Sequence, residues 1–300
     1  MRMTITMFNP LTMRYNENNE IVIDELKLCY LSDREQLACL SSVEVGDTVV
    51  IDRYLFYRFL NERFRFCFNV VEDGESVAQL KFGHYTDQED APLYVFLKVM
   101  NPVLYDAGRL KRLLLLPEAM GMVFNNFTEV DLALDGGLNF PSLIKRLMRD
   151  KTITTIINGK AVRGRKGVLQ GLCFEYSTTL DRLCHPSVTI KQKKAIANRC
   201  RGISVQAYDK KAEIDNHSDK QYILDHYGNP KRLYRLEIRL HYQELKDYFA
   251  MCNLFPAPED LFDAEGLRKM FFYHLSAVIR FTKGRCRIDW ETLLKCNGRV

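Results

Sequence analysis

Three stretches in the second half of the chain alternate between apolar and polar residues, which is the pattern of a β-strand with one buried face. In residues 203–208 the apolar positions are Ile203, Val205 and Ala207, and the polar set ends at Tyr208. A mixed-charge segment follows at once, made of Asp209, Lys210, Lys211 and Glu213. The pattern predicts a strand that ends with a phenol on its polar side, beside cations. An amphipathic tyrosine at the rim of a sheet is the alternative.

The second stretch, residues 127–135 (FTEVDLALD), places Glu129, Asp131 and Asp135 on one side of the predicted strand. Like charges two residues apart on one face repel each other unless a cation or a basic partner lies between them. Carboxylate oxygens are the ligands that Mg²⁺ and Mn²⁺ prefer. We therefore expect Asp131, and with it Asp135, to hold a divalent metal, and an exposed, solvated strand edge is the alternative.

The third stretch, residues 233–240 (LYRLEIRL), turns Leu236, Ile238 and Leu240 inward. Its polar side carries Glu237 between two arginines, Arg235 and Arg239. The three polar faces together offer carboxylates for a metal, a tyrosine nucleophile and cations that offset developing charge. That set suits metal-assisted transfer of a phosphodiester to a tyrosine, with Tyr208 and Lys210 as the catalytic pair.

The remaining pattern predicts an α+β fold, with an antiparallel sheet, flanking helices and a small helical C-terminal part. Strands are expected at residues 49–59, 64–71, 77–82, 93–100, 152–158, 171–177 and 187–193. Helices are expected at residues 110–124, where Pro117 would open the second part, and at 140–150, 242–252, 258–281 and 290–295. We divide the chain into an N-terminal β-rich half-domain (1–125), a catalytic half-domain (126–250) and a C-terminal helical segment (251–300).

Composition narrows the class of protein. The chain has 300 residues, of which 47% are hydrophobic, enough for one large domain or two modest ones. Its longest aliphatic run is residues 113–116, and residues 1–11 lack the layout of a secretory signal, so we expect a cytoplasmic protein. The nine cysteines form no C-x-x-C pair, which predicts reduced thiols in place of a zinc site or a disulfide framework.

Charge is distributed unevenly along the chain. Residues 1–100 hold ten Lys/Arg and sixteen Asp/Glu, whereas residues 142–211 hold sixteen Lys/Arg and four Asp/Glu. A solvated helix face accounts for part of this basic charge, but the charge spreads over predicted helix, strand and turn, which favours a polyanion such as DNA as the partner. The expected DNA-binding residues are Lys191, Lys193, Lys194, Arg199, Arg201, Arg163, Arg165 and Lys166.

The three motifs resemble those of the replication initiation factor family, which comprises initiators of rolling-circle plasmids and related relaxases of integrative conjugative elements. FTEVDLALD (127–135) is similar to the family's Thr-Arg-hydrophobic-Asp-Leu-Ala-x-Asp strand. VQAYDKKAE (205–213) is similar to its hydrophobic-x-x-Tyr-(Asp/Asn)-Lys-x-x-Glu motif, and YRLEIRL (234–240) to its Arg-hydrophobic-Glu strand. The resemblance covers about residues 127–249.

The resemblance implies an initiator/relaxase-like core in which Tyr208 is the nicking tyrosine and Asp131 and Glu237, with Asp135 as a third candidate, bind Mg²⁺ or Mn²⁺. The implied activity is a DNA strand transferase, a tyrosine nickase and ligase that nicks and rejoins origin DNA through a covalent 5′-phosphotyrosine. Glu129 stands where the family usually has arginine, and the C-terminal part is short for a full origin-recognition domain. The chain contains no His-hydrophobic-His pair, the metal motif of other rolling-circle initiators.

Three functions stay open at this point: a rolling-circle replication initiator of a plasmid or phage-like element, a conjugative relaxase, and a non-catalytic DNA-binding regulator that kept the fold. The intact Tyr208, Asp131 and Glu237 argue against the third. We expect origin duplex and single-stranded DNA as partners, count a host helicase and a second copy of the chain (a homodimer) as further candidates, and expect no membrane association.

Overall fold

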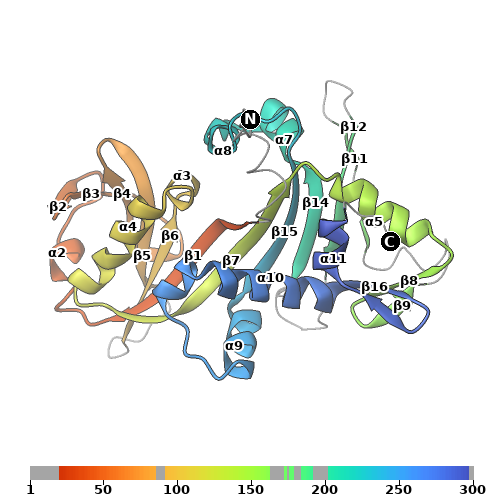
Figure 1. Cartoon of the computed structure of the whole chain (residues 1–300). Coiled ribbons are helices and arrows are strands. Elements are labelled where there is room, and N and C mark those ends of the chain that lie inside the picture. Colours follow the sequence, from red (N-terminus) through yellow and green to blue (C-terminus); the bar gives the residue numbers. More distant parts are fainter. Residues whose placement is uncertain are drawn as a thin grey trace, which may run out of the picture.

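The computed structural model describes residues 20–85, 92–162, 172–173, 176–178, 184–191 and 202–296. Its main feature is an eleven-stranded sheet in the order β10-β13-β14-β15-β7-β1-β6-β5-β4-β3-β2 (Figure 1). Every pairing between the described strands of this sheet is antiparallel. The predicted fold class, α+β with an antiparallel sheet and flanking helices, is confirmed.

The N-terminal half contributes six strands and three short or medium helices. These are β1 (Ile21–Ser32), α2 (Ala38–Ser41), β2 (Thr48–Ile51), β3 (Tyr54–Arg58), β4 (Phe64–Glu72), β5 (Glu75–His84), β6 (Leu93–Val99), α3 (Asn101–Leu104) and α4 (Ala107–Ala119). Strand β1 connects the N-terminal strands to the rest of the sheet, because it pairs with β6 on one side and with β7 on the other. The sheet therefore continues across the division we placed at residue 125.

The following elements up to residue 226 are β7 (Val123–Gly136), α5 (Phe140–Arg149), β8 (Ile153–Ile157), β9 (Lys160–Val162), β10 (Leu172–Cys173), β11 (Tyr176–Thr178), β12 (Cys184–Pro186), β13 (Val188–Lys191), β14 (Ser204–Asp209), α7 (Lys210–His217) and α8 (Gln221–His226). The last elements are β15 (Tyr234–His241), α9 (Tyr242–Met251), the 3-10 helix η1 (Pro258–Phe262), α10 (Ala264–Val278), β16 (Ile279–Lys283), β17 (Cys286–Ile288) and α11 (Trp290–Lys295).

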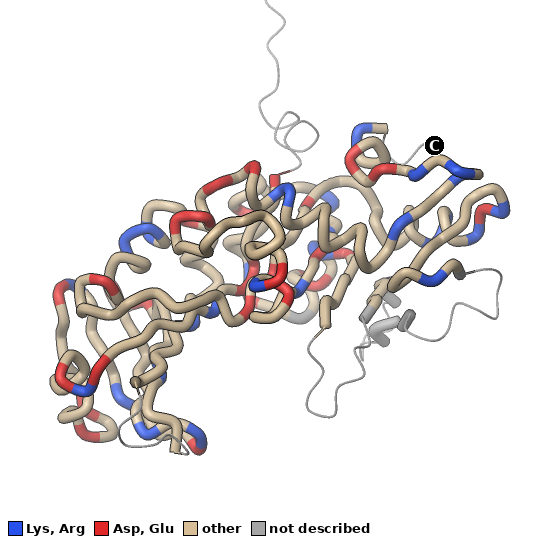
Figure 2. The backbone as a smooth tube through the Cα atoms, turned by 90° about the horizontal axis from the view of Figure 1, so that it is seen from below, with Lys and Arg blue, Asp and Glu red and all other residues tan. Residues whose placement is uncertain are grey.

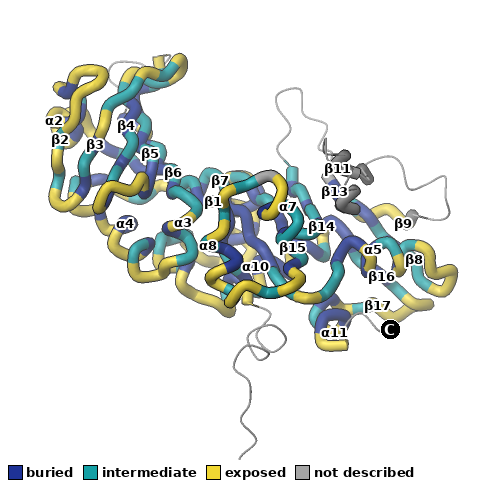
Figure 3. The backbone as a smooth tube through the Cα atoms, turned by 90° about the horizontal axis from the view of Figure 1, so that it is seen from above, coloured by how far each residue is buried: buried dark blue, intermediate teal, exposed yellow. Residues whose placement is uncertain are grey.

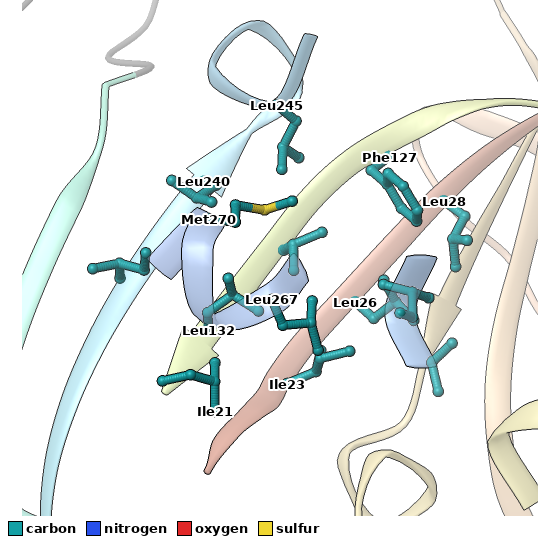
Figure 4. Close-up of a cluster of buried hydrophobic side chains, with 14 of the residues drawn as sticks. Ile21, Ile23, Leu26, Leu28, Phe127, Leu132, Leu240, Leu245, Leu267 and Met270 are labelled. Carbon is teal, nitrogen blue, oxygen red and sulfur yellow. The ribbon is translucent and has the colours of Figure 1, made fainter. Parts of the chain in front are cut away.

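The apolar face of the sheet is packed against helices. Figure 4 shows Leu267 and Met270 of α10 beside Leu132 of β7 and Leu240 of β15, all of which are buried. Helix α5 packs against β14 and β15 on the side of the same hydrophobic core. The central strands are accordingly buried, whereas the hairpin turns are exposed (Figure 3). One face of the central sheet is thus covered by helices and belongs to the hydrophobic core. The opposite face carries the polar side chains.

Several predicted boundaries need correction. Residues 49–59 form a hairpin, not one strand, because the chain turns at Asp52, whose φ is 54°. Helix α4 ends at Ala119 with Pro117 in its last turn, so Pro117 does not open a second part. The predicted strand 171–177 is divided between β10 and β11, which belong to different sheets.

The C-terminal segment contains more than helices. The predicted helix 258–281 is a 3-10 turn followed by α10, which ends at Val278. Strands β16 and β17 follow and join β8 and β9 in a four-stranded sheet, so long-range pairing overrides the helical pattern at residues 279–281. Within the described ranges, none of the helices has the length and apolar content needed to cross a membrane.

Candidate active site

The three motif strands lie side by side in the order β14, β15, β7, and their polar residues share one face. The register pairs Tyr208 with Arg235, and Arg235 with Asp135 on the next strand. On the opposite side, Val205 and Ala207 of β14 and Ile203 just before the strand are buried, as the alternation predicts. Antiparallel pairing therefore gathers on one face side chains that are about thirty to a hundred residues apart in the sequence.

Tyr208 and Glu237 are in direct contact. The phenol of Tyr208 donates a hydrogen bond to Oε2 of Glu237 over 2.9 Å. Burial and the charge of Glu237 hold the pKa of Tyr208 well above its ordinary value, so the phenol is neutral in this arrangement. Burial also raises the pKa of Glu237, against the opposing effect of Arg235. A carboxylate with a raised pKa is a stronger base, and it lies where the phenol's proton would go.

Lys210 lies beside the same phenol. It is the first residue of α7, and Asp209 begins that helix by accepting a hydrogen bond from the backbone N–H of Ala212 over 2.9 Å. The Nζ of Lys210 is 5.7 Å from the centroid of the Tyr208 ring and 2.9 Å from Glu213. Its side chain is 2% exposed, and burial together with the charge of Arg235 lowers its pKa. The two predicted catalytic residues are therefore neighbours.

Arg235 is the centre of a buried ion cluster next to this pair. Its Nε and Nη2 donate to Asp135 over 2.7 and 2.6 Å, its Nη1 is 2.5 Å from Asp24, and its Nη2 also donates to Tyr105 over 2.7 Å. Although burial disfavours a charged carboxylate, Arg235 and Lys210 lower the pKa of Asp24 to about 2. The cluster holds one guanidinium between two carboxylates.

Sequence reasoning missed Asp24 and Tyr105. Asp24 lies at a bulge in β1, between the residues that pair with Leu132 and Asp131 of β7, and Tyr105 follows α3. In the sequence, Asp24 stands out as an aspartate that directly follows an apolar strand segment. That pattern does not identify the residue with which the carboxylate pairs. Asp24 reaches Arg235 because β1 pairs with β7 and β7 with β15, and Tyr105 reaches it because α3 packs against β1.

Asp131, one of the predicted metal ligands, is paired with Arg239. Arg239 donates through Nε and Nη2 to both carboxylate oxygens, with distances of 2.6 to 3.0 Å. Burial, reinforced by the charge of Glu237, nevertheless raises the pKa of Asp131 to about 7. Acidic and basic residues are interleaved in this central part of the molecule (Figure 2).

Glu129 lies at the edge of the same face. It accepts a hydrogen bond from Lys27 over 3.0 Å and lies 3.4 Å from Nδ1 of His241. The hydrogen bond from His241, together with Lys27, lowers the pKa of Glu129 to about 2 despite its burial. Glu129 is thus engaged by Lys27 and His241 of the protein itself.

The predicted metal ligands differ in how well they fit a divalent ion. Both oxygens of Asp135 are taken by the buried Arg235. Among the residues that the structure describes, no group of three or more His, Cys, Asp or Glu side chains could hold a metal. The charge of Glu237 adds to the raised pKa of Asp131, and burial raises the pKa of both carboxyl groups. Two carboxylates suffice for Mg²⁺, which commonly completes its shell with water and substrate phosphate.

Seven of the eight predicted DNA-binding residues lie outside the part of the chain that the structure describes, and the eighth, Lys191, lies in β13. These seven are Lys193, Lys194, Arg199, Arg201, Arg163, Arg165 and Lys166. Lys191 ends β13, where its backbone pairs with Ser204 of the tyrosine strand. The basic segment therefore contributes a strand directly beside β14.

Comparison with solved structures finds a similar protein, whereas two sequence comparisons find none. No family model matches the chain, and no curated protein matches it. The chain is similar to a solved structure of a rolling circle replication initiator protein from Geobacillus stearothermophilus, with 13% sequence identity, 89% of each chain covered and a TM-score of 0.46.

Proposed function

We propose that this protein is a DNA strand transferase that initiates rolling-circle replication by nicking and rejoining DNA through Tyr208. The observation that carries the proposal is the hydrogen bond from the Tyr208 phenol to Glu237, with Lys210 beside the ring. A tyrosine that only packs at a sheet rim needs neither a buried carboxylate as its acceptor nor a buried cation as its neighbour. The three ordered motifs, with their resemblance to rolling-circle initiators and relaxases, support the same chemistry.

In the proposed reaction, the Tyr208 oxygen attacks a DNA phosphorus in line, and its proton passes to Glu237. The bond between phosphorus and the 3′ oxygen breaks, the 3′ oxygen takes up a proton from solvent, and the 5′ phosphate remains esterified to Tyr208. Rejoining is the reverse: a 3′ hydroxyl attacks the ester, and the departing phenolate recovers its proton from Glu237. Lys210 provides positive charge near the phosphate.

A divalent ion belongs to the proposal. Asp131 and Glu237 would hold Mg²⁺ or Mn²⁺, which polarises a scissile phosphate when bound. Arg239, whose side chain is partly exposed, would have to leave Asp131 for the ion to bind there. In the resting arrangement Arg239 offsets the negative charge of Asp131.

The test is formation of a covalent adduct. Labelled single-stranded oligonucleotides that tile the DNA on both sides of the encoding gene are incubated with the protein and Mg²⁺, and adducts are separated on a denaturing gel. Wild type should form an adduct whose peptide mass maps to Tyr208. Tyr208→Phe should form none, whereas Tyr176→Phe, Tyr234→Phe and Tyr242→Phe should keep it. An adduct that survives Tyr208→Phe would overturn the assignment.

The same experiment separates the other two functions. An adduct formed with DNA from a conjugative transfer origin, and not with a replication origin, would identify a relaxase with the same chemistry. DNA binding without any adduct in the wild type would leave a DNA-binding regulator.

A further inference from the structure

The polar face of the candidate active site does not end at β7. A series of ion pairs crosses from Glu129 to Lys27 (3.0 Å), from Lys27 to Glu25 (3.2 Å) and from Glu25 to Lys98 of β6 (3.0 Å). Arg239, the partner of Asp131, lies 3.9 Å from Glu129 at the start of this series. The face that bears Tyr208 and Glu237 is therefore continuous with a face of the N-terminal strands.

Strand β6 shows what this continuing face consists of. Its odd-numbered residues, Leu93, Val95, Leu97 and Val99, are buried in the core. Its other side presents Tyr94, Phe96 and Lys98, of which Tyr94 is 47% exposed. The alternation is strict, so these three side chains share the face that holds Lys98 and its partner Glu25.

The neighbouring strands extend the same face by register. Lys98 pairs with Gln79 of β5, Gln79 with Asn69 of β4, and Asn69 with Tyr57 of β3, which is 42% exposed. Phe96 pairs with Lys81, whose Nζ is 6.0 Å from the ring centroid of Phe59. We call the outward residues Tyr57, Asn69, Gln79, Lys81, Tyr94, Phe96 and Lys98 the N-terminal sheet face.

The charge of the N-terminal sheet face differs from that of its surroundings. Residues 1–100 carry sixteen Asp/Glu against ten Lys/Arg. The seven residues of the face nevertheless include two lysines, three aromatic rings and two amides, and none of them is a carboxylate. The other side of these strands belongs to the core that includes Leu40 of α2 and Leu113 of α4.

We propose that the N-terminal sheet face binds single-stranded DNA that leads to or from Tyr208. Exposed aromatic rings on an open sheet stack with unpaired bases, and lysines between them contact the phosphates. Six strand spacings of ~4.8 Å separate β15 from β3, a path of about 29 Å. At ~3.4 Å per nucleotide of a stacked strand this path spans about eight nucleotides, within the ~4–16 that one OB fold binds. The direction of the path rests on the proposed function, whereas the binding itself does not.

Duplex DNA is the weaker candidate for this surface. Its base faces are stacked inside the helix, so Tyr57 and Tyr94 would have no partner there, and duplex binding depends mainly on phosphate contacts. The face carries only two lysines for such contacts, Lys81 and Lys98, and its three aromatic rings would add nothing. Tighter binding of single-stranded DNA than of duplex DNA therefore distinguishes the two possible ligands.

The experiment measures the fluorescence anisotropy of a fluorescein-labelled dT20 oligonucleotide and, separately, of a 20-base-pair duplex. Tyr57→Ala and Tyr94→Ala should each raise the Kd for dT20 by roughly 5-fold or more, the lower end of the loss for one stacked base. Tyr94→Phe should keep wild-type affinity, because the ring remains. The matched control is Tyr273→Ala, which removes a ring that is 46% exposed on α10, outside the N-terminal sheet face.

Several outcomes would overturn the proposal: no binding of dT20 by the wild type, Kd values of both alanine variants within twofold of wild type, an equal loss in Tyr273→Ala, or an equal loss with the duplex. Thermal unfolding of each variant confirms that it is folded. Because the assay requires no nicking, Tyr208→Phe should bind dT20 like the wild type. A protein that forms no adduct but shows the tyrosine-dependent binding would refute the proposed function and retain this one.

Discussion

Glu237→Gln is the sharpest test of the chemistry at Tyr208. The substitution keeps the size and shape of the side chain, which is only 6% exposed, and removes its ability to take a proton. Loss of a positioned general base lowers the rate of the chemical step by ~10²–10⁴-fold, about 3–5 kcal/mol in activation free energy. We therefore expect adduct formation to slow by at least about a hundredfold while DNA binding is retained.

The same substitution should leave the fold intact. A carboxyl whose folded pKa is raised contributes stability that is present at low pH and is lost as the pH rises through that folded pKa. Above it, the charged Glu237 is unfavourable relative to a neutral isostere, and the glutamine carbonyl still accepts a hydrogen bond from Tyr208. Glu237→Gln should thus be at least as stable as wild type at pH 8, as measured by urea unfolding.

The assay follows adduct formation from pH 5 to 9 with the tiling oligonucleotides. Wild-type rates should fall as acid protonates Glu237, and Glu237→Gln should lose that acid limb. Glu72→Gln is the matched control, because Glu72 is an equally buried carboxylate, 4% exposed, that pairs with Arg109 in the N-terminal half. A Glu237→Gln protein with the wild-type rate and pH profile would refute the role of Glu237 as proton acceptor.

Three further predictions concern charge. Arg235→Met should destabilise the protein by ~3–5 kcal/mol in urea unfolding, because two buried carboxylates lose their cation; a loss under about 1 kcal/mol would contradict the cluster. Asp131→Asn should abolish cleavage but keep DNA binding, and wild-type cleavage should stop in excess EDTA. Since the folded pKa of Asp131 is raised to about 7, the wild type should lose stability relative to this variant as the pH rises from 4 through 7, by a few kcal/mol in order of magnitude. Alanine at Lys191, Lys193 and Lys194 should lower the slope of log K against log salt by ~0.7–0.9 for each phosphate that the protein no longer neutralises, and an unchanged slope would place the DNA elsewhere.

Local alternation in the sequence is enough to assign the faces of β14 and β15, whereas in β7 it puts Phe127 on the side of Glu129 although a bulge turns Phe127 into the core. A period of two places Val205 and Ala207 in the core and Tyr208 on the polar side without reference to any neighbour, and both assignments to the core agree with the structure. The same period of two places Glu237 on one side of its strand with Arg235 and Arg239. The roles assigned to these residues stay predictions.

Which polar residues meet depends on the tertiary structure. A period of two cannot state the register between strands, so the sequence could not show that Glu237 accepts a hydrogen bond from Tyr208 or that Asp135 belongs to Arg235. It could not show that the bulge in β1 brings Asp24 to the same arginine, or that pairing of β1 with β6 extends the polar face as far as Tyr57. Alternation is a property of each segment alone, whereas these contacts depend on pairing between segments that lie far apart in the chain.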